Sequence, residues 1–310
     1  MNKTKRICLI LALGSLFMLF FISGPDYYAL RSFKNLWNLG HILFFSLLPL
    51  LIFNDSKAST SYPKHVLFIM VLALLLGTLI EILQTGLDSR IPDVGDILRN
   101  IIGALVGSVF LLPSRKNFPK KRLIVIQMLV ALLVIMQIAP VVSAFWDEKL
   151  ANRQFPLLSS FETPFEIDRW TGGVVFEVSD DIKKNGVTAM KVMLNTDTYS
   201  GVALKYFPGD WEGYRFFQFS VFNPESDELK LTCRIHDWQH TQSRQKYEDR
   251  FNRSFSILQG WHTVTIPLEQ VELAPENRQM DMQRIQGVGI FAVRLPYTRT
   301  IYIDDVRLKP

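Results

Sequence analysis

The sequence contains only two cysteines in 310 residues, and they lie far apart, at Cys8 and Cys233. Cys8 stands at the edge of an apolar run and Cys233 is alone in the C-terminal half, so no intrachain disulfide is expected. Three motifs of common catalytic sites are also missing: a glycine-rich phosphate loop, a Gly-x-Ser-x-Gly nucleophile turn and a His-Glu-x-x-His zinc motif. No internal repeat or low-complexity tract is present. These absences argue against a disulfide scaffold, a P-loop enzyme and a zinc protease of that type.

The apolar residues are unevenly distributed along the chain. Although 48% of the residues are hydrophobic, the long apolar runs all lie before about residue 146, and short alternating stretches follow. Each run approaches the roughly 20 residues that cross a bilayer. We therefore expect an α-helical transmembrane bundle of five spans, at 7–23, 36–53, 65–83, 97–112 and 122–146. The first run resembles a signal peptide, but it has no clear small-x-small cleavage site, so we expect it to be retained.

Basic residues flank the expected spans asymmetrically. They gather before the first span, between the second and third, and between the fourth and fifth. The positive-inside rule assigns these segments, including the N-terminus, to the cytoplasm. Five spans then place the residues after 146 outside. The net charge of +5 is concentrated in these loops, so it indicates a lipid bilayer as partner and no nucleic acid.

A series of polar and small residues interrupts the third and fourth runs: Glu81, Gln84, Arg90, Asp96, Asn100, Gly103 and Gly107. The last four fall at offsets of four, seven and eleven, so they share one face of a helix. Ionisable groups at membrane depth are costly and indicate a functional site by default, while two glycines four residues apart let another helix approach closely. The candidate catalytic residues are Glu81, Arg90 and Asp96, with His41, Gln84 and Asn100 beside them.

Residue types alone leave two interpretations of this series open. In the first, the carboxylates with a His and Arg90 relay a proton or hold a phosphate, and an enzyme of this kind would use Glu81 or Asp96 as the base and Arg90 to hold the phosphate. In the second, the same residues form a structural polar lock between helices, and Arg90 only neutralises a carboxylate. His41, alone in its apolar run, is by itself more typical of a packing residue.

The spacing of this series, with a His in the preceding span, resembles the VanZ-like family of small bacterial membrane proteins over about residues 30–112. The family is named for a glycopeptide (teicoplanin) resistance protein, so the resemblance implies a role at the cell envelope, in the bacterial cytoplasmic membrane, with no settled reaction. The family usually has Asp-Lys shortly before the His. Here the stretch reads Asn-Leu-Trp-Asn-Leu-Gly-His41, so this segment supplies no carboxylate partner for His41.

After residue 155 the pattern changes to short segments rich in Val, Phe, Tyr and Ile, separated by Gly, Pro, Asn and Asp. This pattern is typical of a β-sandwich, and the alternation within segments gives each strand one wet and one buried face. The expected strands are 189–195, 201–207, 215–222, 229–236, 261–268, 287–293 and 300–308. We therefore predict a multi-domain chain, with a transmembrane domain at 1–146, a linker at 147–158 and an extracytoplasmic all-β domain at 159–310.

Several short motifs lie at the turns and the ends of these strands: Phe161-Glu162, Gly-Asp-Trp211, Gly-Tyr214, Phe-Asn223-Pro224, Gly260-Trp261 and Ile303-Asp304-Asp305-Val306. They resemble the galactose-binding-like jelly rolls, among which carbohydrate-binding modules are the nearest members. The resemblance implies a jelly-roll fold and a glycan ligand. Glu162 and Asp304 could hold a structural Ca²⁺, which prefers carboxylate and carbonyl oxygens, or they could cap loops.

The segment 236–253 breaks the alternation and gathers aromatic and basic residues. Because sugars bind to flat aromatic faces and to polar groups that hold their hydroxyls, the candidate ligand-binding residues are Trp211, Tyr214, Trp238, His240, Tyr247 and Arg250. Alternatively, Trp238 and Tyr247 close the end of the sandwich while the charges are solvated. The stretch His236, Asp237 and His240 also suggests zinc, but no clear further ligand accompanies it.

Three functions are compatible with these features. The first is an envelope protein whose jelly roll binds exopolysaccharide or wall glycan, while the VanZ-like bundle anchors it and acts on or stabilises a lipid-linked envelope component. The second is a membrane enzyme that acts on a lipid phosphate through Glu81, Asp96 and Arg90. The third is a structural anchor whose sandwich binds a protein, with a membrane protein among the expected partners.

Overall fold

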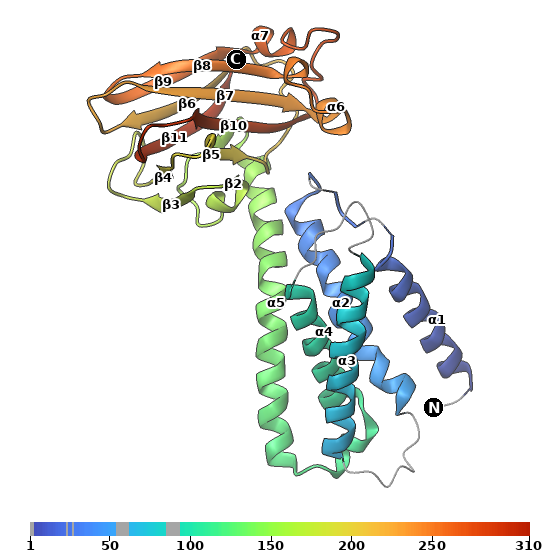
Figure 1. Cartoon of the computed structure of the whole chain (residues 1–310). Helices are drawn as coiled ribbons and strands as arrows, with labels where there is room; N and C mark the ends of the chain where they lie inside the picture. The colour runs from blue at the N-terminus through green and yellow to red at the C-terminus, as the bar shows by residue number, and fades with distance from the viewer. Residues whose placement is uncertain (1–2, 23, 27, 54–61, 85–93) are drawn as a thin grey trace. The chain divides into compact units, whose positions relative to one another are not determined.

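The structure is a computed structural model that describes residues 3–22, 24–26, 28–53, 62–84 and 94–310. The chain forms two compact units, Met1–Phe145 and Trp146–Pro310, which Figure 1 shows as a helical part and a β part. The boundary between them lies next to residue 146, where the long apolar runs of the sequence end.

The first unit is built from helices: α1 (Lys3–Leu19), α2 (Arg31–Ile52), α3 (Tyr62–Gln84), α4 (Val94–Val106) and α5 (Lys120–Gln154). A π-helical turn, η1 (Gly107–Leu111), and a 3₁₀ turn, η2 (Pro113–Asn117), follow α4, and α5 continues into the second unit. Large apolar side chains such as Leu11, Leu67 and Met128 are exposed on these helices. Helices that are apolar on every side are typical of membrane spans.

Four helices are long and apolar enough to cross a membrane: Arg31–Ile52, Tyr62–Gln84, Val94–Leu111 and Lys120–Gln154. They correspond to the second to fifth expected spans. The first expected span falls on α1, which has 17 residues and therefore measures about 26 Å, less than the roughly 30 Å of a hydrocarbon core. Over the described residues the structure supports four spans, and the predicted count of five is not confirmed.

Two glycines bring α4 close to α2. A Cβ atom at Gly103 would lie 2.5 Å from the carbonyl oxygen of Ile42 and 2.9 Å from Cβ of Phe45, and one at Gly107 would lie 2.8 Å from Cγ of Pro49. Real Cβ atoms do not approach so closely, so the predicted small-residue contact is confirmed. The helix face that carries Asp96 and Asn100 is the same face that meets α2.

The second unit is an antiparallel sandwich of two sheets, with strand orders β3-β4-β11-β6-β9, where β1 also pairs with β11, and β2-β5-β10-β7-β8. Counted from β4 to β11, one sheet takes the first, eighth, third and sixth strands and the other takes the second, seventh, fourth and fifth. This is the strand order of an eight-stranded jelly roll. The strands are β1 (Leu157–Ser159), β2 (Trp170–Gly172), β3 (Val175–Ser179), β4 (Ala189–Leu194), β5 (Tyr199–Leu204), β6 (Phe216–Asn223), β7 (Leu229–Asp237), β8 (Phe251–Ile257), β9 (Gly260–Pro267), β10 (Ile285–Val293) and β11 (Arg299–Lys309).

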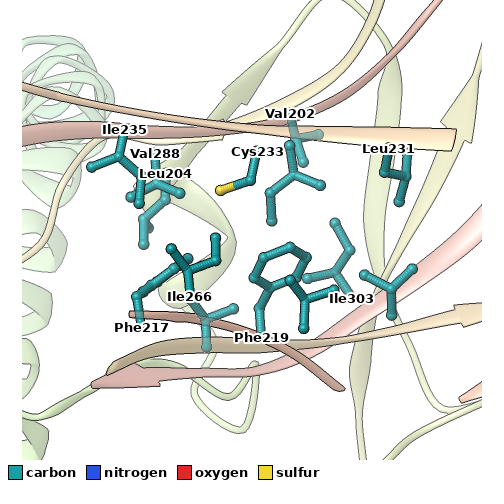
Figure 2. Close-up of a cluster of buried hydrophobic side chains, with 14 of the residues drawn as sticks. Val202, Leu204, Phe217, Phe219, Leu231, Cys233, Ile235, Ile266, Val288 and Ile303 are labelled. Carbon is teal, nitrogen blue, oxygen red and sulfur yellow. The ribbon is translucent and has the colours of Figure 1, made fainter. Parts of the chain in front are cut away.

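Alternate residues of the two sheets form the core of the sandwich. Figure 2 shows Leu231 and Cys233 of β7 with Val288 of β10 on one side, and Phe219 of β6 with Ile303 of β11 on the other. Burial raises the pKa of the Cys233 thiol against the opposing effect of Arg234. Cys233 is therefore an uncharged packing residue.

A buried ion pair holds the end of α5 within the second unit. Arg169, at the end of a 3₁₀ turn η3 (Glu166–Arg169), donates from Nη2 and Nε to Asp147 at 2.7 and 3.0 Å and from Nη1 to the carbonyl oxygen of Leu158 at 2.8 Å. Both side chains are almost fully buried. The segment 147–158, predicted as a linker, is instead helical to Gln154 and then enters β1.

Candidate functional site

The outward face of the β2-β5-β10-β7-β8 sheet combines aromatic, basic and very small residues. Because core-facing residues alternate with outward ones, the burial pattern and the register identify the outward positions. They are Tyr199, Gly201 and Ala203 on β5, Gly287, Gly289, Phe291 and Val293 on β10, Lys230, Thr232, Arg234 and His236 on β7, and Asn252, Ser254 and Ser256 on β8.

Glycines on β10 make room for two long side chains of β7. Gly287 pairs with His236, and Gly289 pairs with Arg234. A Cβ atom at Gly287 would lie 2.6 Å from Cε1 of His236, which is too close, whereas one at Gly289 would lie 3.4 Å from Nε of Arg234, an ordinary contact. The imidazole and the guanidinium therefore lie across the centre of the sheet, over the glycine backbone.

Arg250 joins these two side chains at the edge strand. Its backbone is extended and directly precedes β8, where Phe251 pairs with Ile235, so Arg250 continues the strand opposite His236. Burial and then the charge of Arg234 lower the pKa of Arg250, and the phenols of Tyr247 and Tyr199 oppose this effect. Arg234 and Arg250 thus lie close enough to repel each other.

His236 is uncharged at neutral pH because of these surroundings. Burial lowers the pKa of His236 to about 3, and the charges of Arg234, His240 and Arg250 add to this effect, while Asp237 opposes it. His236 is only 5% exposed. It is therefore a buried, neutral member of this cluster, and the two arginines carry the positive charge of the cluster.

Exposed aromatic rings border this cluster. Tyr199 is 71% exposed and Tyr247 is 64% exposed. Tyr199 packs edge-on against Phe291 with ring centroids 5.8 Å apart, and the guanidinium of Arg250 lies 5.6 Å from the ring centroid of Tyr247. We call the following residues the aromatic-arginine face: Tyr199, Arg234, His236, Tyr247, Arg250 and Phe291.

Arg278 fixes the segment that carries Tyr247 and Arg250. Its Nη1 and Nη2 atoms donate to Asp237 at 2.5 and 2.9 Å, and its Nε donates to Asp249 at 2.6 Å. Asp237 also accepts the backbone N–H of His240 at 2.9 Å, as the N-cap of the short helix α6 (Trp238–Gln242). Nδ1 of His240 lies 3.2 Å from Asp249. The segment 236–253 is therefore clamped to the sandwich by one arginine.

These contacts also explain the ionisation of the clamp. Burial acts to raise the pKa of Asp237, but the hydrogen bonds from Arg278, Asp281 and His240 together outweigh it and lower this pKa. The bond from Arg278 also lowers the pKa of Asp249. Burial lowers the pKa of His240 against its hydrogen bond to Asp249. His240, predicted as a ligand-binding residue, is buried and engaged in this clamp. The sequence analysis missed Arg278 because it lies far along the chain from its partners.

Trp211 is a core residue. It is fully buried, its ring stacks on Phe217 with centroids 5.3 Å apart, and its Nε1 donates to the carbonyl oxygen of Pro208 at 3.2 Å. Neither face of the indole is open to a sugar. The prediction that Trp211 binds ligand directly is therefore corrected: a Gly-Asp-Trp turn has the same sequence whether its Trp points inward or outward.

The other predicted ligand residues lie at separate places. Tyr214 is half-buried against Phe155 and lines a pocket of about 420 Å³ together with Glu212 and Glu272. Trp238 is partly exposed, with the guanidinium of Arg284 4.8 Å from its ring centroid. Only Tyr247 and Arg250 of the predicted set belong to the aromatic-arginine face. The sequence analysis did not single out Tyr199, Arg234 and Phe291, although their outward register in alternating strands was a usable signal.

The predicted metal positions accept backbone hydrogen bonds. Glu162 accepts the N–H groups of Val187 and Thr188 at 2.9 and 3.0 Å, and Asp304 accepts those of Lys184 and Asn185 at 2.8 and 3.0 Å. Both carboxylates therefore cap the loop that these residues form. Burial raises the pKa of Asp304, and the nearby charge of Glu162 adds to this effect. The Ca²⁺ site stays a prediction.

The zinc alternative receives no support either. Among the described residues, no group of three or more His, Cys, Asp and Glu side chains could hold a metal ion. His236, Asp237 and His240 therefore do not form a zinc site in this part of the chain.

A second polar cluster lies between α2 and α4. Nδ1 of His41 is 2.8 Å from Oδ1 of Asn100, and Nε2 of His41 is 3.5 Å from Asp96. Arg99 donates to Asp96 at 2.5 Å, and the ring centroid of Phe20 is 4.6 Å from that of His41. Asp96 of α4 thus provides the carboxylate partner that the segment before His41 lacks.

The remaining predicted residues of this cluster are distributed around it. Glu81 is buried on α3, and Gln84 donates to the carbonyl oxygen of Phe20 at 2.7 Å. Arg90 lies outside the described residues. Arg99, which the sequence analysis passed over, takes the neutralising position beside Asp96 through an i, i+3 spacing that was visible in the sequence.

The helical region matches a known family. Residues 5–115 match the family model VanZ/LLP1, so the chain contains a VanZ-like domain, which extends further toward the N-terminus than the predicted 30–112. No sequence among the curated proteins matches this chain significantly.

Solved structures similar to this chain are carbohydrate-binding modules and parts of glycoside hydrolases. A family 11 carbohydrate-binding module from Clostridium thermocellum, in complex with a β-1,3-1,4-mixed-linked tetrasaccharide, is 15% identical, with 49% of this chain and 94% of that chain covered and a TM-score of 0.38. The family 11 module of a cellulosomal cellulase from the same organism is 15% identical, with 49% of this chain and 92% of that chain covered and a TM-score of 0.37. An exo-β-agarase is 13% identical, with 50% of this chain and 25% of that chain covered and a TM-score of 0.39. The jelly-roll assignment of this chain rests on its own strand order.

Proposed function

We propose that this chain is a membrane protein of the bacterial cell envelope whose β-sandwich binds a polysaccharide on the aromatic-arginine face. The observation that carries the proposal is the coincidence, on one open sheet face, of exposed aromatic rings with hydrogen-bonding side chains over a floor of small residues. Tyr199 and Tyr247 supply the rings, and Arg234 and Arg250 supply the polar groups, while His236 is buried beside the two arginines.

The chemistry of this face suits a sugar polymer. Aromatic rings bind the apolar faces of sugars, and a few well-placed polar groups fix their hydroxyls. Gly201, Ala203, Gly287 and Gly289 keep the middle of the face low, so that a chain can lie across the strands. The clamp at Arg278 holds Tyr247 and Arg250 in position before the ligand arrives, which reduces the entropic cost of binding.

Loop charge supports an extracytoplasmic position for the sandwich. The basic loops between α2 and α3 and between α4 and α5 belong in the cytoplasm by the positive-inside rule. With α5 as the last span, residues after it are then outside, whether α1 crosses the membrane or not. The helical unit would anchor the sandwich in the cytoplasmic membrane and act on or stabilise a lipid-linked envelope component.

A second candidate function is catalysis on a lipid phosphate by the polar cluster of α2 and α4. The observation that favours it is His41, buried between Asn100 and Asp96, an arrangement in which a carboxylate orients an imidazole. Asp96 would assist His41, and Arg99 would bind the phosphate, with Arg90 and Glu81 as the further predicted members. Retention of phosphatase or transferase activity in an Asp96→Asn, His41→Gln double variant would exclude this candidate.

Affinity electrophoresis tests the glycan proposal. The full chain, in detergent micelles, is run through gels that contain individual bacterial exopolysaccharides and wall polymers. We expect retardation by one polymer class, and we expect Tyr199→Ala and Tyr247→Ala each to reduce it. Trp261→Ala, which removes an aromatic ring from the opposite sheet, should run like the wild type. A folded protein that no polymer retards would favour the structural alternative, in which the sandwich binds a protein.

A further inference from the structure

Acidic residues are missing from the outward positions of four strands on the proposed binding face. Lys230 and Arg234 stand on β7 and Arg250 precedes β8, whereas none of the outward positions of β5, β7, β8 and β10, all of which the structure describes, is Asp or Glu. On the opposite sheet, by contrast, Lys191 lies 3.9 Å from Glu177 and 3.6 Å from Asp181. The basic residues of the binding face have no such carboxylates at the outward positions of these strands.

Arg234 and Arg250 are neighbours without a carboxylate partner. Within residues 146–310, which the structure describes in full, neither guanidinium forms an ion pair, and the buried Nε atom of each has no hydrogen-bond partner. Asp237 and Asp249 are both engaged by Arg278, and Glu248, two residues before Arg250, forms no ion pair with either arginine in this described range. Two like charges held together without a counter-ion disfavour the free state, and an anionic ligand would remove that cost.

The surroundings of the arginine pair identify the class of anion. Tyr199 and Tyr247 border the pair, so the anion and a stacked ring can be parts of the same ligand. The planar guanidinium of Arg binds carboxylate and phosphate groups with two parallel hydrogen bonds. Arg therefore recognises the shape of these groups as well as their charge. A sugar polymer with acidic groups provides both parts.

We propose that the aromatic-arginine face binds an acidic glycan, whose sugar rings lie on Tyr199 and Tyr247 and whose carboxylate or phosphate groups bind Arg234 and Arg250. This inference rests on the proposed function and adds the charge of the ligand to it. The charges of residues 151–310 are nearly balanced, with 19 Lys and Arg against 21 Asp and Glu, so net charge alone does not attract such a polymer to the sandwich and the local arginine pair has to provide the attraction.

Binding of matched polymers to the full chain in detergent micelles tests the inference. The probes are polygalacturonate, the same polymer after its carboxyl groups are reduced to alcohols, and a glycerol phosphate polymer. We expect an acidic polymer to bind about tenfold more tightly than the reduced one, because charge-assisted hydrogen bonds are about twice as strong as neutral ones. The preference should fall as salt rises. The better of the two acidic polymers identifies carboxylate or phosphate as the recognised group.

Variants assign the preference to the arginine pair. Arg234→Gln and Arg250→Gln should each reduce the preference for the acidic polymer by about tenfold. Arg234→Lys keeps the charge but loses the planar fork, so its preference should lie between those of the wild type and Arg234→Gln. Lys191→Gln removes a positive charge from the opposite sheet and should leave the preference unchanged. Thermal unfolding of each variant verifies that the sandwich is folded.

The outcomes separate this inference from the proposed function. Equal binding of polygalacturonate and its reduced form, lost in Tyr199→Ala, would overturn the acidic preference and leave glycan binding in place. Binding of none of the polymers would overturn both. Binding to vesicles of anionic lipid in place of the polymers, with the same dependence on Arg234, would also overturn the inference and make the face a membrane contact.

Discussion

At the scale of single residues, Asp147 and Arg169 decide where the sandwich unit begins. Their side chains are 3% and 0% exposed, and hydrogen bonds from Arg169 reach Asp147 in α5 and the carbonyl oxygen of Leu158 in β1. Removing one partner of a buried pair leaves an uncompensated charge, which costs more than the pair contributes. Asp147 therefore belongs to the fold of the sandwich, although it directly follows an apolar run.

Arg169→Met should lower the free energy of unfolding of the sandwich by about 3 kcal/mol. The double variant Asp147→Asn, Arg169→Met should lose less than the sum of the two single variants, because it leaves no unpaired charge. Urea denaturation of a fragment that starts at Trp146, followed by tryptophan fluorescence, measures both quantities. Additive losses would show that the two residues do not act as a pair.

His236 makes the sandwich sensitive to acid. Its pKa is lowered to about 3, first by burial and then by Arg234, His240 and Arg250, whereas an unfolded histidine has a pKa of about 6.5. Between these values the unfolded state binds a proton that the folded state does not, so stability is present above pH 6.5 or so and is lost as the pH falls. We expect a loss of about 3 kcal/mol between about pH 7 and about pH 4.

Denaturation of the same fragment as a function of pH measures this loss. The lowered pKa values of Asp237 and Asp249 act in the same direction but only below the usual range of a carboxyl group. The lowered pKa of His240 acts in the same direction and over the same range as that of His236. His236→Gln should therefore reduce the slope above about pH 4.5, and the slope that is left belongs to His240. An unchanged slope in this variant would contradict the buried, neutral state of His236.

At the scale of the elements, strand-like composition made the sandwich predictable. The seven predicted strands correspond to β4, β5, β6, β7, β9, β10 and β11, because each is a run rich in apolar, β-branched or aromatic residues between turn residues. β8 was missed because Arg253 and Asn252 follow an irregular segment, and β1, β2 and β3 are too short to show a period. The aromatic-arginine face depends on which strands become neighbours, and that information is not local.

Helix spacing predicted the glycine contact of α4 but not every member of the polar cluster. Gly103 and Gly107 follow directly from the four-residue offset. The pairing of His41 with Asp96 and Asn100 requires the register between two helices, which no single segment contains. Trp211 was misassigned for a similar reason, since its burial is set by Phe217 on another strand.

Gly103→Ala should destabilise the helical unit. The added Cβ would meet the backbone of Ile42 at 2.5 Å, so α2 and α4 would have to separate. The matched control is Gly40→Ala, because a Cβ at Gly40 meets nothing within 4 Å. Size-exclusion chromatography of the detergent-solubilised protein after heating measures the temperature at which half of it has aggregated. This temperature should be lower for Gly103→Ala and unchanged for Gly40→Ala. Equal midpoints would contradict the close contact of the two helices.

The loop from Lys184 to Thr188 should be independent of calcium. Its N–H groups already occupy oxygens of Glu162 and Asp304. We expect the same melting temperature of the sandwich fragment with added Ca²⁺ and with a chelator, and a lower one for Glu162→Ala in both. A rise in melting temperature with Ca²⁺ that disappears in Asp304→Asn would support the calcium prediction and contradict this expectation.

At the scale of the whole molecule, the chain combines a VanZ-like membrane unit with a jelly-roll unit. Each unit has its own core, and each carries a polar cluster that packing alone does not require: His41 with Asp96 in the first, and Arg234 with Arg250 in the second. The division into two units was readable from hydropathy, because the change from long apolar runs to alternating stretches occurs within a few residues. The sites were only partly readable, because each one joins residues from separate elements.

The central claim is that a polysaccharide binds the outward face of the β2-β5-β10-β7-β8 sheet. Hydroxyl-radical footprinting of the full chain, with and without a saturating acidic polysaccharide, tests it most directly, because Tyr199 and Tyr247 are exposed and react readily when free. The account predicts protection of Tyr199, Tyr247 and Phe291, and no change at Trp261 on the opposite sheet. Protection confined to the opposite sheet, or to the pocket beside Tyr214, would contradict it.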